Sequence, residues 1–229
     1  PRKWVRKAGV YGLGDTSPLD KAVLTAVVTR LEEDSSLYVR SVAAGSIGCL
    51  GRRAIATGEG KSLIPDCLQA LTDSLKCEEN RLAMTLAQKR SIKFVRPTDD
   101  SDVCEGGDVN LNFERFKPVR SAVRENALWS LVILCSHGTT VMGDALESTI
   151  LALKNVVQED ENALSVGFAS DALVRLVNLQ PQGETVLPLI RNLGAELLTI
   201  LRASPVQSWD TLVRGGLKPD ILAELFPEN

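Results

Sequence analysis

Four nine-residue stretches determine the predicted fold: VRKAGVYGL (residues 5–13), VRSVAAGSI (39–47), VRENALWSL (123–131) and VGFASDALV (166–174). Each has Val first, a small residue fifth and an aliphatic residue ninth, and positions four and eight apart share one face of an α-helix. The small middle residue lets a neighbouring helix approach closely, as stacked helical repeats require. The stretches begin 34, 84 and 43 residues apart. The middle interval therefore equals one repeat of about 42 residues plus an insertion of similar size.

The composition agrees with helix packed on helix. Of 229 residues, 44% are hydrophobic, with 33 Leu and 20 Ala, whereas aromatic residues make up only 4%. Leu and Ala are strong helix formers, and strands are enriched in aromatic and β-branched residues. The net charge is -3, so the chain has no general positive field for nucleic acid or anionic lipid, and nucleic acid is not an expected partner.

Apolar spacing and Gly, Pro, Asp and Ser punctuation divide the chain into helices. We take each Val-Arg helix as the second of a pair, the first pair lacking its first helix, and treat residues 1–229 as one domain. We expect this domain to be part of a larger protein or a subunit of a complex. Residues 204–229 are interpreted as a C-terminal cap or as a further, poorly matched repeat. The expected helices lie near 2–14, 19–33, 36–51, 61–75, 119–135, 142–158, 162–178 and 184–202, with short ones near 206–213 and 218–225.

These residues resemble the HEAT repeat family, in which an Asp in the turn often stands five residues before a Val-Arg pair. Asp34 has that spacing from Val39, whereas Pro118 and Glu161 occupy the turn in two other copies and Gly167 replaces Arg. The resemblance implies a right-handed α-α superhelix of HEAT or armadillo type with roughly four to five repeats, and Arg side chains that brace the turns between repeats. A non-repetitive helical bundle is the alternative. The repeat positions are Val5, Arg6, Asp34, Val39, Arg40, Val123, Arg124 and Val166.

Residues 76–118 form the insertion, which is far longer than a turn between paired helices needs. Its first part reads as a helical extension. Its second part alternates in polarity on either side of an acidic, glycine-bearing stretch, which predicts a β-hairpin. Its aromatic side chains either pack the hairpin onto the helices or form a patch that binds a partner. The candidate partner-binding residues are Phe94, Arg96, Phe113, Arg115 and Phe116.

The sequence contains no recognisable catalytic constellation. It has one histidine, no phosphate-binding loop and no G-x-S-x-G motif, and five cysteines without a C-x-x-C pair, which favours a reducing intracellular compartment over a disulfide framework. No apolar run approaches the ~18 residues of a membrane span. We expect no metal and no cofactor. The enzymatic alternative is a HEAT-like phycobilin lyase that handles an open-chain tetrapyrrole, with Glu125 and Asp171 as weak candidate acids.

The predicted function is therefore a non-enzymatic scaffold, adaptor or assembly subunit. Stacked repeats give a long surface with a rigid base, which suits recognition of a protein partner better than a small substrate. The groove of the superhelix and the hairpin insertion are the expected binding elements. The sequence does not identify the partner.

Overall fold

The computed structural model is all-helical in the part of the chain that it describes, which comprises residues 2–77, 80, 123–136, 144–178 and 186–206. This confirms the all-α prediction, and the described residues contain no strand. The predicted hairpin, the short helices near 206–213 and 218–225 and most of the expected cap lie outside the described residues. The helices are α1 (Lys3–Thr16), α2 (Lys21–Glu33), α3 (Leu37–Thr57), α4 (Leu63–Lys76), α7 (Val123–Cys135), α8 (Ala145–Glu159), α9 (Ala163–Asn178) and α10 (Val186–Arg202).

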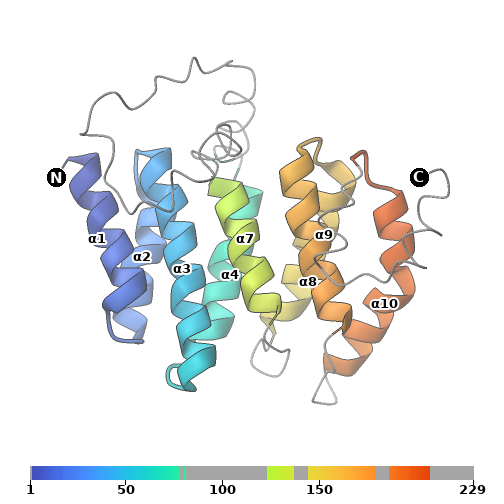
Figure 1. The fold of residues 1–229 in the computed structure, drawn as a ribbon, viewed down its shortest axis with the longest axis horizontal. Coiled ribbons are helices and arrows are strands. Elements are labelled where there is room, and N and C mark those ends of the chain that lie inside the picture. The colour runs from blue at the N-terminus through green and yellow to red at the C-terminus, as the bar shows by residue number, and fades with distance from the viewer. Residues whose placement is uncertain (1, 78–79, 81–122, 137–143, 179–185, 207–229) are drawn as a thin grey trace.

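The helices form two layers. In one layer α1, α3, α7 and α9 lie side by side in that order, and in the other α2, α4, α8 and α10 do the same (Figure 1). Across the layers α2 packs on α3, α4 on α7 and α8 on α9, as the paired-helix interpretation predicts. Helices α4 and α7 pack together although the whole predicted insertion separates them in sequence. The arrangement is compatible with a helical-repeat solenoid.

Helix boundaries agree with the predicted ranges within a few residues, apart from the end of α3. The sequence suggested an end near Gly51, but α3 continues to Thr57 and stops at Gly58, which adopts the left-handed conformation with φ 74°. Gly51 instead packs against Leu134 of α7. A glycine can therefore mark a helix contact rather than a helix end. Helix α2 begins after Asp20, whose side chain accepts a hydrogen bond from the Val23 amide at 2.8 Å.

The core between the layers is aliphatic. Val39, Val123 and Val166, the first residues of three of the four stretches, have at most 1% of their surface exposed, whereas Val5 in α1 is 62% exposed. Among the described residues no aromatic side chain is buried. The largest fully buried side chains are Leu and Ile. Helices α1, α3, α7 and α9 can pack closely because small residues alternate with the aliphatic ones in their repeated stretches.

Two helix–helix contacts repeat with the spacing of the sequence stretches. A Cβ placed on Gly14 would lie 2.6 Å from Cβ of Ser46, and one on Gly48 would lie 2.6 Å from Cβ of Ser130. The Ser46 hydroxyl donates to the carbonyl of Val10 at 3.0 Å, and the Ser130 hydroxyl makes the corresponding bond to α3. The repeated α1–α3 and α3–α7 contacts show that 34 and 84 residues are the structural intervals along this layer.

Within the described ranges, no helix is both long and apolar enough to cross a membrane.

Candidate functional site

The described aromatic side chains all belong to one layer. Trp4, Tyr11, Tyr38, Trp129 and Phe168 are carried by α1, α3, α7 and α9, and we call the surface that they form the aromatic face. Trp4 is 40%, Tyr11 63% and Trp129 47% exposed, and the other two are half-buried. Large aromatic side chains normally contribute to cores or interfaces. Their exposure here makes this layer the candidate binding surface.

Repeat register explains why four of these rings, those of Trp4, Tyr11, Tyr38 and Trp129, share one face. Tyr11 and Trp129 are the seventh residues of their stretches, and Gly45 occupies the same position in α3 between them. Trp4 and Tyr38 stand seven residues before Tyr11 and Gly45, which is close to two full helical turns. A Cβ added at Gly45 would meet no atom within 4 Å. The middle of the aromatic face is therefore open above α3.

One end of the aromatic face combines rings with cations. Trp4 and Tyr38 meet edge to face, with ring centroids 5.7 Å apart and planes at 73°. The Lys7 ammonium lies 4.8 Å from the Tyr38 ring centre and donates to the Tyr38 hydroxyl at 3.0 Å, and the Lys3 ammonium lies 4.7 Å from the Trp4 ring centre. Cation–π contacts of this kind hold positive charge beside an apolar surface. The two lysines are therefore positioned at the rings.

The other end of the aromatic face is apolar. Trp129 of α7 and Phe168 of α9 contact each other with ring centroids 5.5 Å apart and planes tilted by 53°. Ile133 and Leu164, one helical turn from these rings, are half-buried. This end offers apolar area from the two rings and their aliphatic neighbours.

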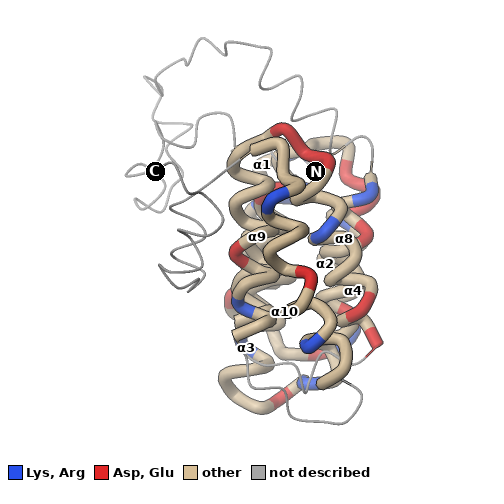
Figure 2. The backbone as a smooth tube through the Cα atoms, turned by 90° about the vertical axis from the view of Figure 1, so that its right-hand side faces the viewer, with Lys and Arg blue, Asp and Glu red and all other residues tan. Residues whose placement is uncertain are grey.

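Charge is divided between the layers. Helices α1, α3, α7 and α9 carry eight Lys or Arg and three Asp or Glu, whereas α2, α4, α8 and α10 carry six and seven (Figure 2). One of the three acidic residues, Glu125, is only 2% exposed, and burial raises its pKa to about 8. The layer with the aromatic face is therefore positive although the whole chain is not.

The arginines at the repeat positions contact the turns that connect the two layers. Arg6 binds Asp34 with two bonds, Nε to Oδ2 at 2.7 Å and Nη2 to Oδ1 at 2.8 Å, and Arg40 donates to the Asp34 carbonyl at 2.6 Å. Arg124 lies 3.2 Å from Asp160 in the α8–α9 turn. The pKa of Asp34 is lowered because its carboxylate accepts the hydrogen bonds of Arg6. These contacts give the arginines a structural role.

The α8–α9 turn carries a second polar contact with α7. Asp160 accepts from the amide of Asn162 at 2.9 Å, and Asn162 caps α9 by accepting from the Leu164 amide at 2.9 Å. Asn162 also donates to Oε1 of Glu125 at 3.0 Å. The sequence pattern placed Glu161 at the turn position of Asp34, but Asp160 makes the corresponding contacts. The two turns are equally long, and the shift arises because Val166 stands one residue further into α9 than Val39 stands into α3.

The candidate acids do not line an accessible surface. Glu125 is 2% and Asp171 3% exposed, so neither faces solvent as exposed charges on amphipathic helices usually do. Asp171 accepts from Arg175 Nε at 2.7 Å, and Arg175 also donates to the Ser136 hydroxyl. Asp171 is therefore part of a helix-to-helix contact.

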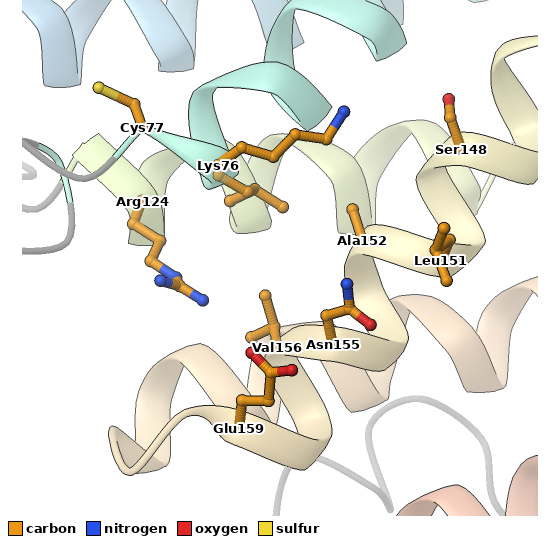
Figure 3. A pocket seen from close by; sticks show the side chains of 10 residues that line it. Lys76, Cys77, Arg124, Ser148, Leu151, Ala152, Asn155, Val156 and Glu159 are labelled. Carbon is orange, nitrogen blue, oxygen red and sulfur yellow. The ribbon is translucent and has the colours of Figure 1, made fainter.

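The described residues enclose a small cavity at the junction of three helices. It has about 240 Å³ and lies between the end of α4, the start of α7 and α8 (Figure 3). Lys76, Cys77, Arg124, Asn155 and Glu159 supply its polar lining. Sites for drug-sized ligands usually enclose ~300–1,000 Å³. Arg124 is engaged with Asp160, so the cavity offers little that is dedicated to a ligand.

The cysteines of the described ranges do not form a nucleophilic or metal site. Burial raises the pKa of both Cys67 and Cys135 to about 12, which keeps these thiols protonated. Cys49 and Cys77 are half-buried, and all four are free thiols. No group of three or more His, Cys, Asp or Glu in these ranges is placed to hold a metal ion.

The residues predicted to bind a partner are not located by the structure. Phe94, Arg96, Phe113, Arg115 and Phe116 all lie outside the described residues. The aromatic face was not predicted from the sequence. The sequence feature that indicates it is the seventh position of the repeated stretches, where Tyr11 and Trp129 lie outside the helix stripe formed by the Val, small and aliphatic positions.

No protein-family model, no curated protein and no solved structure matches this chain in the comparisons with known proteins.

Proposed function

We propose that the protein is a non-enzymatic protein–protein interaction scaffold or assembly subunit that binds a partner through the aromatic face. The observation that carries the proposal is the placement of Trp4, Tyr11, Tyr38, Trp129 and Phe168 together on one layer, while no aromatic side chain is fully buried in the described part of the core. Exposed clusters of aromatic side chains are enriched at protein interfaces, where Trp and Tyr supply much of the binding energy.

We further propose that the architecture is a HEAT-like right-handed superhelix. Support comes from the recurrence of the Gly–Ser contacts at intervals of 34 and 84 residues and from the matching turns at Asp34 and Asp160. Each of these two aspartates ends a helix, accepts an amide two residues later and pairs with an arginine of the neighbouring helix in the other layer. The insertion at 76–118 remains a second proposed recognition element, and the free thiols favour a reducing compartment.

A protein partner fits the aromatic face better than a small ligand does. The rings are spread over four helices and lie open, whereas the cavity beside Arg124 is below the usual size for a ligand site. Covering one exposed aromatic side chain stabilises a complex by roughly 1.5–3 kcal/mol before association costs are subtracted. Several rings acting together are therefore needed for a stable complex.

Site-specific photo-crosslinking tests the proposal. A benzophenone amino acid replaces Tyr11 on the aromatic face or, as a matched control, Leu151, which is 60% exposed on α8 in the other layer. We expect one protein, identified by mass spectrometry from the native extract, to be captured from position 11 and not from position 151. Its capture should be lost when Trp129→Ala is added. Equal capture from both positions, or capture that is insensitive to Trp129→Ala, would contradict the proposal.

A further inference from the structure

The cations available on the aromatic face are few, and two of them lie against its rings. Lys3 and Lys7 lie against Trp4 and Tyr38, and Arg52 is exposed on α3, seven residues after Gly45 on the same stripe. The half-buried Lys7 is held in place by its bond to the Tyr38 hydroxyl. Cations that are already ordered beside apolar surface lose less side-chain entropy when they meet an anion.

The remaining arginines of this layer are engaged within the fold. Arg6 and Arg124 pair with aspartates, and Arg53 donates to the carbonyls of Gly14 at 3.1 Å and Ser17 at 2.9 Å. A continuous phosphate-binding track would need these side chains. A partner with negative charge at a few points and apolar groups between them needs only Lys3, Lys7 and Arg52.

The centre of the aromatic face has the shape to receive an apolar side chain. Tyr11 and Trp129 project from α1 and α7, and Gly45 between them has open space where a side chain would stand. Among the acidic side chains of α1, α3, α7 and α9 in the described residues, Glu125 and Asp171 are buried, and the exposed one is Asp15, one turn beyond Tyr11 at the last turn of α1. Apolar contact in the middle and positive charge at the Trp4 end complement a segment in which acidic and apolar residues alternate.

We infer that the aromatic face binds an acidic protein segment that carries apolar side chains. The apolar side chains pack on Tyr11, Gly45 and Trp129, and the carboxylates pair with Lys3, Lys7 and Arg52. Charge complementarity sets the preference for this class of partner and the rate of association, and ring burial provides the affinity. This inference rests on the proposed function, because it names the chemistry of the partner that the scaffold binds.

Fluorescence anisotropy with defined probes tests the inference on the full chain. The first probe is a short fluorescein-labelled peptide that alternates glutamate with leucine and phenylalanine, the second has lysine in place of glutamate, and the third is an oligothymidine. We expect the acidic peptide to bind at least about tenfold more tightly than the basic one, with affinity that weakens from low to physiological salt. Binding of oligothymidine in place of the acidic peptide, or equal binding of both peptides, would overturn the inference.

Variants locate the binding. Trp4→Ala with Trp129→Ala, and separately Lys3→Glu with Lys7→Glu, should each weaken the acidic peptide by about tenfold or more. The control Lys21→Glu, at a side chain 79% exposed in the other layer, should change its affinity less than about twofold. Gly45→Leu should also weaken binding, because it fills the open space without a clash. Peptide binding that is insensitive to all three aromatic-face variants would overturn the inference. It would also be overturned if the protein bound itself instead of the peptide and these variants abolished that self-association.

The two proposals fail separately. A partner that crosslinks at position 11 but binds without salt dependence and ignores the acidic peptide would leave the scaffold function intact and refute its acidic chemistry. Absence of any partner at position 11 would remove the function itself.

Discussion

Ionisation of the buried Glu125 should control the pH dependence of stability. Its carboxyl group is 2% exposed between α7 and α9, and Oε2 has no hydrogen-bond partner among the described residues. Burial is the main cause that raises its pKa from 4.5 to about 8, the nearby charge of Asp160 adds to the rise, and the hydrogen bond from Asn162 opposes it. The folded state therefore binds the proton more tightly than the unfolded state does.

The sign and size of the effect follow from that difference. Stability from a raised pKa is fully present below the unfolded value and is lost as the pH rises toward the folded value. Each pH unit between 4.5 and about 8 removes about 1.4 kcal/mol, so Glu125 alone should lower the free energy of unfolding by about 3 kcal/mol between pH 4.5 and 7. This loss is a large fraction of the 5–15 kcal/mol that stabilises a typical domain.

Glu125→Gln should abolish this dependence, because the amide stays neutral and its oxygen still accepts from Asn162. Urea unfolding followed by helical circular dichroism should give similar stabilities near pH 4.5 and a variant more stable by up to about 3 kcal/mol at pH 7. Subtracting the parent's free energy of unfolding from that of Glu125→Gln at each pH cancels the titration of all other groups. Glu32→Gln, at an exposed position of α2, is the control and should stay close to the parent. A flat difference between Glu125→Gln and the parent from pH 5 to 8 would refute the reasoning.

Two further predictions concern packing. Gly48→Ala should lower the free energy of unfolding by roughly 1–2 kcal/mol because its Cβ would lie 2.6 Å from Cβ of Ser130. Gly45→Ala, in open space, should raise the free energy of unfolding by roughly 0.5–1 kcal/mol in the same urea titration. Changes of the same sign at both sites would contradict the contact. Val123→Asp should cost roughly 3 kcal/mol or more by burying an unpaired charge, whereas Val5→Asp, at a position 62% exposed, should shift the melting temperature little. Equal shifts at the two positions would contradict the difference in burial.

Helix positions and pairings could be predicted from the sequence because local and long-range signals agree. The stripe of apolar residues at helical spacing defined α2, α8 and α9 to within a few residues. The pairing of α4 with α7 followed from the interval of 84 residues, which one ordinary repeat cannot fill. A repeat supplies this information because each of its copies must bury the same face.

The finer errors arise where one residue type serves two physical roles. Gly51 was interpreted as a helix end because glycine weakens a helix, yet it allows the close approach of Leu134, and α3 continues for two more turns. The turn before α9 was assigned to Glu161 by counting residues, although Asp160 makes the contacts with Arg124 and Asn162. The two turns have the same length, but Val166 stands one residue further into its helix than Val39 does, so counting back from the valine reaches the wrong turn residue.

The position of the aromatic side chains could not be derived from composition because low aromatic content fits two arrangements. In one arrangement a few rings fill the core, and in the other the core needs none. Gly14, Gly48, Ser46 and Ser130 bring α1, α3 and α7 close together within one layer, and the largest fully buried side chains of the described core are leucine and isoleucine. The described rings lie on the outer side of α1, α3, α7 and α9, and of these Phe168 packs in part against the core. Trp4, Tyr11 and Trp129 are 40–63% exposed, so a large part of each ring gains burial only against a partner, and that burial is the free-energy source that an interaction surface on this layer requires.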